Sequence, residues 1–412
     1  MIDERMTDIR VVELFAGVGG FRLGLEKASE RYKVIWANQW EPSMKEQYAF
    51  GCYQKHFGVA DNIVCADIAK VKDAVPQHDL LVGGFPCQDY SIMNKEAKGI
   101  KGKKGKLWWE IDSIISNRRP PFIFLENVDR IIRSPGEQKG RDFSVILRCL
   151  YEKGYAVEWR VINAAEYGQG QRRRRTFIIA YHNDTDIYRR FADDVCKYGL
   201  KAMHKTISNN GILAKAFPIS GHSREYTDKW IDEIIYCDTD EIMEKERIDL
   251  YNAGAMMNGR VYSLNVEPVQ ENFIALEKTL ENRSLPERYF VQDKDLSQWE
   301  YLKGAKDETR IKKDGQEYRF SEGAVQFPEP LHKPSRTILT SESQMGRATH
   351  IVKDPLTGRL RTLTPVECER LNGFPDGWTN TGMPEKMRYF CMGNALVVPL
   401  ITRIGRTIVD CI

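Results

Sequence analysis

The sequence predicts an α/β protein with a doubly wound sheet, joined to a second, smaller domain of less regular structure. Short apolar runs alternate with turn signals over residues 1–185, helical stretches fit between those runs, and the composition changes beyond residue 185. The chain has 412 residues, of which 42% are hydrophobic and 29% charged. It is therefore expected to be globular and long enough for roughly two or three domains.

The expected elements of the first segment alternate in type along the chain. Strands are predicted at residues 9–14, 33–38, 79–83, 121–126 and 176–181. Helices are predicted between them, for example at residues 21–29, 107–117 and 143–152. This β-α-β order is typical of a parallel sheet with helices on both faces.

The second half of the chain divides again near its end. Residues 186–384 are more charged and have fewer apolar runs, whereas residues 385–412 become apolar and helical around residues 395–401. A helix this apolar needs a core to pack against, so we expect it to return to the first domain. The predicted domains are residues 1–185, 186–384 and 385–412.

Charge and cysteine content exclude several classes of protein. The 61 Lys and Arg residues against 58 Asp and Glu give a net charge of +3, which excludes a uniformly basic coat but allows a local basic cleft. Nine cysteines without Cys-x-x-Cys spacing fit a reducing compartment, and neither the cysteines nor the histidines show metal-ligand spacing. No signal peptide or membrane-length apolar run is evident. We expect a cytoplasmic protein without membrane association or metal.

A glycine-rich turn at residues 15–20 follows the first expected strand. Glycines let the backbone bend and let a ligand approach closely, although a purely structural turn is the alternative. Trp40 and Glu41 follow the second strand, and Asp67 and Ile68 follow another possible strand. Singly, Trp40 suits a core and Asp67 a helix cap. Together, an aromatic face and carboxylates at successive strand ends favour a nucleoside ligand.

Cys87 is the candidate nucleophile. It follows the strand ending at residue 83, which places it at the carboxyl edge of the sheet, where α/β enzymes hold their chemistry. Pro86 restricts the backbone before the thiol. Six lysines and three glycines lie within residues 88–106, a basic loop suited to closing over a polyanion. The alternatives are an inert buried thiol and a solvated surface loop.

Two further segments bring charge to this edge. Glu126 ends a strongly apolar strand, where loss of water favours a protonated carboxyl that can act as an acid. Four consecutive arginines, residues 172–175, directly precede a later strand. Strand alternation predicts Arg173 and Arg175 on one face, where they can hold an anion or a carbonyl oxygen. An ordinary strand-end carboxylate and a solvated basic edge are the alternatives.

The motifs, in this order, resemble those of the DNA (cytosine-5) methyltransferase family. The resembling segments are residues 15–20, 84–88, 126–128, 171–175, 333–338, 363–375 and 393–395. The first is similar to the family's S-adenosylmethionine loop, the second to its nucleophile motif, and the next two to its further catalytic motifs. The chain departs from the family pattern at Gln39, where an acid usually precedes the aromatic residue, and at Gly170, where proline is usual.

The resemblance implies a Rossmann-like, S-adenosylmethionine-dependent methyltransferase domain, with residues 186–384 recognising the target in double-stranded DNA. It implies that Cys87 attacks C6 of a flipped-out cytosine, Glu126 donates to N3, and Arg175, with Arg173 nearby, holds O2. Phe15 would face the sulfonium. The residues implied to bind S-adenosylmethionine are Phe15, Ala16, Gly17, Gly19, Gly20, Trp40, Glu41, Asp67, Ile68, Pro86, Leu107, Asn394 and Ala395.

Three functional hypotheses follow. The first is a sequence-specific DNA cytosine-C5 methyltransferase, a monomer in the bacterial cytoplasm beside the nucleoid. It would be the protective half of a restriction-modification pair, its restriction endonuclease a functional but not necessarily physical partner. The second makes RNA, such as transfer RNA, the substrate, although the large middle section favours DNA. The third is a non-catalytic DNA-binding regulator on the same fold, which would have no need of a thiol nucleophile such as Cys87.

Overall fold

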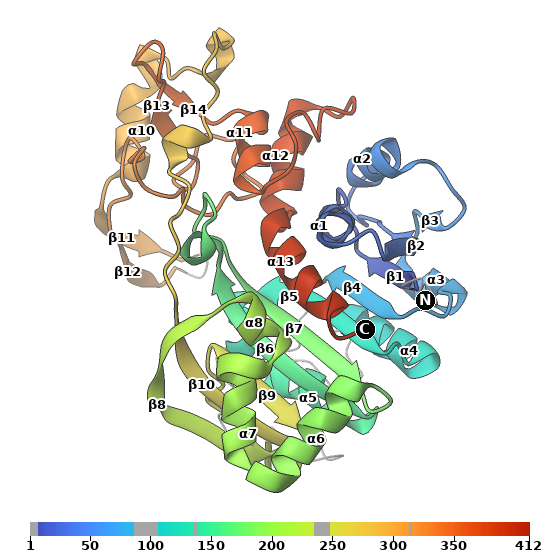
Figure 1. Cartoon of the computed structure of the whole chain (residues 1–412). Coiled ribbons are helices and arrows are strands. Elements are labelled where there is room, and N and C mark those ends of the chain that lie inside the picture. Colours follow the sequence, from blue (N-terminus) through green and yellow to red (C-terminus); the bar gives the residue numbers. More distant parts are fainter. Residues whose placement is uncertain (1–6, 86–105, 135–138, 235–247, 313–314) are drawn as a thin grey trace. The chain divides into compact units, whose positions relative to one another are not determined.

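The computed structural model describes residues 7–85, 106–134, 139–234, 248–312 and 315–412 (Figure 1). Contacts divide the chain into two compact units. Unit 1 comprises Met1–Tyr167, Arg174–Glu271 and Val397–Ile412, and unit 2 comprises Gly168–Arg173 and Asn272–Leu396. The chain therefore passes from unit 1 to unit 2 and back twice.

Within the described residues, unit 1 contains one ten-stranded sheet in the order β3-β2-β1-β4-β5-β7-β6-β9-β10-β8. The strands are β1 (Ile9–Leu14), β2 (Tyr32–Asn38), β3 (Ile63–Val64), β4 (Leu80–Gly84), β5 (Phe122–Val128), β6 (Tyr155–Asn163), β7 (Arg174–His182), β8 (Ile219–Trp230), β9 (Ala253–Met257) and β10 (Arg260–Pro268). β1 to β5 pair in parallel, whereas β7 is antiparallel to β5 and all later pairs are antiparallel. The five expected strands are present, and the expected parallel pairing is limited to β1–β5.

Helices cover both faces of the parallel part of the sheet, which makes it doubly wound. The first four residues of β5 are apolar because both faces of the sheet are buried there, as Ile123 and Phe124 show. Ile123 belongs to a core cluster with residues of α4 (Lys106–Arg118) and α5 (Arg141–Glu152). Phe124 faces the opposite way and packs edge-on against Phe21 of α1 (Gly20–Ala28), with ring centroids 5.0 Å apart.

The last helix, α13 (Val398–Val409), packs against α1 (Figure 1). Gly24 allows the close approach, since a Cβ there would lie 2.6 Å from Cβ of Ile401. The Tyr32 hydroxyl donates to the Gly405 carbonyl at 2.6 Å. The end of the chain therefore belongs to the core of unit 1.

Residues 186–271 also belong to unit 1, where the sequence predicted an irregular second domain. They form α6 (Asp186–Tyr198), α7 (Leu200–Lys205), α8 (Ile212–Ala216) and α9 (Ile231–Ile234) together with β8–β10. Buried charges on β6 hold this segment: Glu158 accepts from the backbone N–H groups of Ile212 and Leu213, and Arg160 donates to the Phe217 carbonyl at 2.6 Å. The two compact units therefore begin and end at other residues than the predicted domains. The functions assigned to the predicted domains stay predictions.

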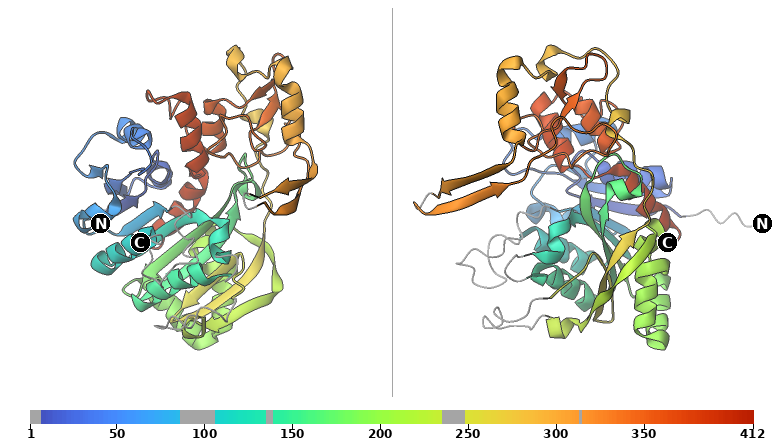
Figure 2. Two further views of the ribbon diagram at one scale, coloured as in Figure 1. Left: turned by 180° about the vertical axis from the view of Figure 1, so that it is seen from behind. Right: turned by 90° about the vertical axis from the view of Figure 1, so that its left-hand side faces the viewer.

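Unit 2 contains smaller elements. They are α10 (Leu296–Lys303), the antiparallel ribbon β11 (Lys306–Ile311) and β12 (Glu317–Glu322), the short pair β13 (Ile351–Lys353) and β14 (Leu360–Thr362), and the helices α11 (Pro365–Leu371) and α12 (Glu385–Asn394). The ribbon extends beyond the rest of its unit in the right-hand view of Figure 2. None of the helices in the described part of the chain is long and apolar enough to cross a membrane.

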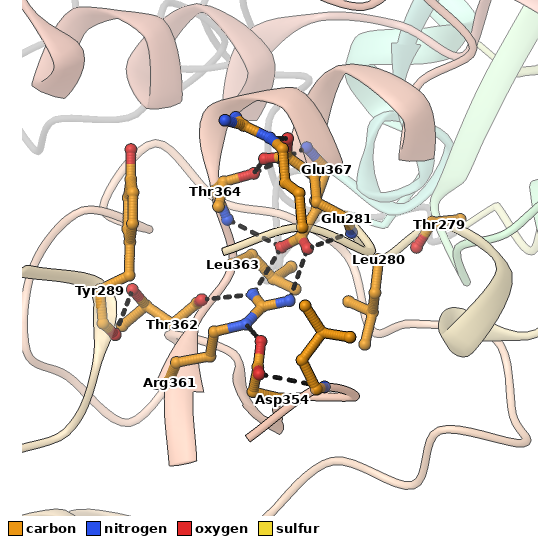
Figure 3. A network of polar contacts seen from close by, with 12 residues as sticks. Thr279, Leu280, Glu281, Tyr289, Asp354, Arg361, Thr362, Leu363, Thr364 and Glu367 are labelled. Atoms are coloured by element: carbon orange, nitrogen blue, oxygen red, sulfur yellow. Dashed lines mark hydrogen bonds and ion pairs between the residues drawn. The ribbon is translucent and has the colours of Figure 1, made fainter. Parts of the chain in front are cut away.

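A buried ionic network organises unit 2 around Arg361, whose side chain is fully buried (Figure 3). Its Nε donates to Asp354 at 2.8 Å, and its Nη atoms donate to both carboxylate oxygens of Glu367 at 2.7 and 2.9 Å. Glu367 also completes a capping box with Thr364 at the start of α11. The Thr364 hydroxyl in turn donates to Glu281 at 2.7 Å. The segment 363–375 is therefore fixed by buried, satisfied charges.

Candidate active site

Glu126 and Arg175 form an ion pair at the carboxyl end of β5. Antiparallel pairing of β5 with β7 sets Val128 opposite Arg175 and brings the two side chains together. Arg175 Nε lies 2.7 Å from Glu126 Oε1, and the two side chains are 18% and 13% exposed, respectively. The pair is shielded from bulk water but still accessible, as a site for a small polar ring requires.

Gly84, at the end of β4, leaves room beside this pair. It is the register partner of Glu126 in the parallel pairing of β4 with β5. A Cβ on Gly84 would lie 3.1 Å from Glu126 Oε2, so any larger side chain would press on that oxygen. Cys87 and Pro86 follow shortly afterwards in the sequence but lie outside the described residues.

Asn127 fixes the backbone next to that segment. Its side chain is 1% exposed, and its Nδ2 donates to the Phe85 carbonyl at 2.9 Å. The side-chain oxygen accepts from the Val128 N–H at 2.8 Å. Asn127 belongs to the motif at residues 126–128, but its role could not be predicted from the sequence, because only the tertiary fold brings it to Phe85.

The glycine turn lies where the strand order reverses, between β1 and β4. This reversal is the usual ligand site of doubly wound sheets. Gly17 and Gly19 have positive φ angles of 56° and 86°, and so does Phe15, at 54°. A Cβ on Gly19 would lie 2.3 Å from the Phe57 ring, whereas a Cβ on Gly17 would meet only the Phe15 carbonyl, at 4.0 Å. Gly19 therefore serves helix packing, while Gly17 borders open space.

Gln39 supports this turn directly. Its Oε1 accepts from the Gly17 N–H at 2.7 Å, and the side chain is largely buried. Asn38, just before it, donates to the Ala66 carbonyl at 2.8 Å and so joins the ends of β2 and β3. Gln39 was noted in the sequence only as a departure from the family pattern. At this position, where the family pattern has an acid, the chain thus uses an amide oxygen as the acceptor for the Gly17 N–H.

The remaining strand-end candidates have different environments. Trp40 is 37% exposed, which contradicts the core alternative, whereas Ile68 is buried in the core. Burial raises the pKa of the half-buried Glu41 above its ordinary value. Asp67 caps α3 (Ile68–Val71) by accepting from the Ala69 N–H at 3.1 Å, as the structural alternative predicted.

Three further residues that were predicted to bind the cofactor have no contact, within the described part of the chain, that supports this role. Leu107, at the start of α4, is half-buried against the core of unit 1. Asn394 ends α12 and is exposed, and Ala395 follows it half-buried; both belong to unit 2. Cofactor contact by any of the three stays a prediction.

Arg173 is placed differently from Arg175. Exposure alternates along the arginine run as predicted, with Arg172 and Arg174 exposed. Arg173 itself is 1% exposed, and it donates to the Ile338 carbonyl at 3.1 Å and to the Gly393 carbonyl at 2.9 Å, all within unit 2. Its guanidinium therefore links three of the segments singled out in the sequence.

Gln171 makes a similar link. Its Nε2 donates to Asn372 Oδ1 at 2.6 Å, and Asn372 donates to the Met392 carbonyl at 2.9 Å. Gly393 has no room for a side chain, because a Cβ would lie 2.3 Å from the Thr340 nitrogen. The later motif segments thus form the internal framework of unit 2.

Glu13 is an ionisable residue that the sequence analysis did not single out. It lies on β1 directly before the glycine turn and is fully buried. The Tyr53 hydroxyl donates to its Oε2 at 2.8 Å, and the Arg22 N–H approaches its Oε1 at 3.4 Å. Burial raises the pKa of Glu13 to about 7. An acid between the apolar residues Val12 and Leu14 of a strand was the available signal.

Comparisons with known proteins show the family of the chain. The profile of the C-5 cytosine-specific DNA methylase family matches residues 9–410. The chain is 47% identical to Type II methyltransferase M.Sau3AI of Staphylococcus aureus over 98% of this chain and 96% of that protein. It is 34% identical to Type II methyltransferase M.HhaI of Haemophilus parahaemolyticus over 45% of this chain and 53% of that protein.

A solved structure agrees in fold. The crystal structure of S. pombe Dnmt2 methyltransferase matches with a TM-score of 0.59 and 16% identity, covering 98% of each chain. At this identity the match shows the fold alone. The family profile and the near full-length relative together establish that the chain belongs to the C-5 cytosine-specific DNA methylase family and is a DNA cytosine-5 methyltransferase.

Proposed function

We propose that the enzyme methylates one specific cytosine in double-stranded DNA, by the residues given below, and protects host DNA from a partner restriction endonuclease. The Glu126–Arg175 pair is the observation that carries the assignment of residues. It lies beside Gly84, three residues before Cys87 in the sequence, at the edge of the sheet where ligands bind. The Type II methyltransferase relatives support the restriction-modification setting.

The glycine turn fits S-adenosylmethionine. Gly17 borders open space at the strand reversal, and Phe15 and the exposed Trp40 offer aromatic surface near strand ends. We assign cofactor contact to the turn, to Trp40, Glu41, Asp67 and Ile68 and, from the resemblance alone, to Pro86, Leu107, Asn394 and Ala395. When bound, this cofactor supplies an electrophilic methyl group to C5 of the cytosine.

The protein's own groups prepare the base. The Cys87 thiolate forms a bond to C6, and the C5–C6 π electrons shift toward C5, which becomes nucleophilic. Glu126 holds N3 by a hydrogen bond and stabilises the electron-rich ring. Arg175 holds O2 and orients Glu126. After methylation, loss of the C5 proton and cleavage of the C6–Sγ bond restore the aromatic ring and the free thiol.

Arg173 acts as a positioning residue rather than as a contact to the base. Its buried guanidinium fixes the carbonyls of Ile338 and Gly393. We assign target recognition to residues 186–384, of which the described part includes the exposed ribbon β11–β12. The enzyme is proposed to act as a monomer in the bacterial cytoplasm, where its DNA substrate lies.

Methyl transfer from radiolabelled S-adenosylmethionine tests the proposal. Mixed-sequence duplex DNA and transfer RNA are compared as acceptors, with wild-type enzyme and Cys87→Ser. Label in duplex DNA as 5-methylcytosine, lost in the variant, is the expected result. Label confined to transfer RNA would move the substrate to RNA. Cofactor binding without transfer, and no covalent trapping on a 5-fluorocytosine duplex, would favour a non-catalytic DNA-binding role.

A further inference from the structure

Two histidines meet in a pocket of unit 1, within the segment assigned to target recognition but separate from the residues assigned to the cytosine and to the cofactor. Nε2 of His204, on α7, lies 3.2 Å from Nε2 of His222, on β8. The pocket around them has a volume of about 550 Å³ and is also lined by Ser208, Asn209 and Lys215. Neither histidine belongs to the segments that resemble family motifs, and 18 residues separate them in the sequence.

Hydrogen bonding fixes the orientation of His222. Its Nδ1 lies 2.9 Å from the Ser223 carbonyl oxygen, which can only accept, so Nδ1 carries a proton. In the neutral ring, Nε2 of His222 therefore presents a lone pair toward His204. A histidine whose second ring nitrogen donates to a backbone carbonyl is the usual arrangement of a metal ligand.

The distance between the two nitrogens fits a shared ion. Two imidazole nitrogens bound to one tetrahedral Zn²⁺, each at roughly 2.0–2.1 Å, lie about 3.3 Å apart. The imidazole planes are inclined by 75° with centroids 4.6 Å apart, so the rings do not stack. In the present contact His204 Nε2 is the donor. Metal binding requires the proton of the His204 ring to move to Nδ1, after which small rotations of the side chains would direct both Nε2 lone pairs to one ion.

We propose that His204 and His222 bind one transition-metal ion of the class that prefers imidazole, represented by Zn²⁺, with water completing its coordination. Among the residues the structure describes, no group of three or more His, Cys, Asp or Glu side chains is arranged to hold a metal, and the proposed site uses these two histidines as its described ligands. The bound ion joins α7 to the edge strand β8. It stabilises this side of unit 1 and takes no part in methyl transfer.

Lys215 distinguishes a cation site from an anion site in the same pocket. Its side chain is exposed, so its ammonium can remain in water when a cation binds. Removing its charge with Lys215→Met leaves Zn²⁺ binding unchanged or tightens it, because like charges repel. The same substitution would weaken binding of an anion such as inorganic phosphate.

Calorimetric titration of the chelator-treated full chain with Zn²⁺ tests the proposal. Wild type is expected to bind one ion at this site, and His204→Gln and His222→Gln are each expected to weaken that binding at least about tenfold. His332→Gln replaces an exposed histidine of unit 2 and serves as the matched control, with unchanged binding. Zn²⁺ held by the exposed thiols of Cys65 or Cys196 would persist in both histidine variants.

Three results would contradict the proposed metal site. The first is that wild type binds no Zn²⁺ at all, and the second is that wild type and both histidine variants bind Zn²⁺ equally. The third result is that the pocket binds inorganic phosphate and that Lys215→Met abolishes this binding. If a histidine variant does not fold, the wild-type protein is loaded with Cu²⁺ and its electron paramagnetic resonance spectrum is measured. Coupling of the copper to two imidazole nitrogens is expected. Coupling to fewer would contradict the site. Methyl transfer by the chelator-treated enzyme is expected to be unchanged, which keeps this outcome separate from the proposed function.

Discussion

Arg175 Nε lies 2.7 Å from Glu126 Oε1. The two residues belong to β7 and β5, which pair in antiparallel, whereas β4, on the other side of β5, is parallel to it. This contact occupies one carboxylate oxygen and leaves the other next to Gly84. The two residues are 49 positions apart in the sequence, and β7 lies between β5 and β6 in the sheet, so that it pairs with β5 directly. The order of strands therefore creates the polar end of the candidate active site.

Glu126→Gln is expected to lower the rate of methyl transfer by about 10²–10⁴-fold, because an amide cannot exchange a proton with the base. Cofactor binding should be unchanged. Steady-state transfer to duplex DNA measures the effect. Glu152→Gln is the matched control, since Glu152 also pairs with an arginine, Arg148, at 2.8 Å but on the surface. Full activity of Glu126→Gln would remove this carboxylate from the mechanism.

Gln39→Leu is expected to weaken S-adenosylmethionine binding by roughly two- to tenfold, because the Gly17 N–H loses its acceptor. Gln39→Glu keeps an oxygen at the same place and should bind the cofactor nearly as well as wild type. Calorimetric titration of the cofactor compares the three proteins. Equal affinity in all of them would show that the turn does not depend on Gln39.

Gly19→Ala should destabilise the protein more than Gly377→Ala. Both glycines have positive φ angles, 86° and 76°, so both substitutions carry the cost of a backbone conformation that favours glycine. Only at Gly19 would the added Cβ strike a ring, that of Phe57, whereas at Gly377 nothing lies within 4 Å. The difference in unfolding free energy, measured in urea, is expected to be about 1–3 kcal/mol. Equal losses of unfolding free energy would mean that the Phe57 ring can move away from an added Cβ at little cost.

Glu13 gives the enzyme a pH-dependent stability. Burial raises its pKa from the ordinary value of 4.5 to about 7, so the folded state holds this proton more tightly than the unfolded chain. The stabilisation is fully present below about pH 4.5 and is lost as the pH rises through 7, by on the order of 3 kcal/mol.

Urea unfolding of wild type and Glu13→Gln across pH 5 to 8 measures this dependence. The amide oxygen can still accept from the Arg22 N–H, and the amide nitrogen can donate to the Tyr53 hydroxyl oxygen, but the group does not titrate. The variant should therefore gain stability relative to wild type as the pH rises, with little difference at the acid end. Parallel curves for the two proteins would contradict a buried, proton-linked Glu13.

Arg361→Leu is expected to lower the unfolding free energy by about 3–5 kcal/mol, because it leaves Asp354 and Glu367 buried without a cation. Arg359→Leu, two residues away, removes an exposed pair with Glu287 and should have little effect on stability. Thermal and urea unfolding compare the two variants. Similar losses would show that the buried network of Figure 3 adds no more than a surface ion pair.

The sequence by itself determined the fold class, the first five expected strands and the candidate residues. Apolar runs such as residues 121–126 are long enough to identify a strand buried on both faces, and glycines followed by a helical pattern identify the turn at residues 15–20. These signals are local, which is why they can be read without the tertiary fold. The resemblance to the methyltransferase family rests on the order of the same segments.

Only the tertiary structure decided which of these residues meet. Arg173 and Arg175 have the same predicted face, yet one holds carbonyls of unit 2 and the other pairs with Glu126. Residues 186–271 join the sheet of unit 1 through buried apolar residues such as Met256 and through hydrogen bonds to buried Glu158 and Arg160 of β6. Hydrogen bonds and ion pairs between distant segments leave no periodic pattern in a sequence, so their partners are determined by the order of strands and the packing of the folded chain.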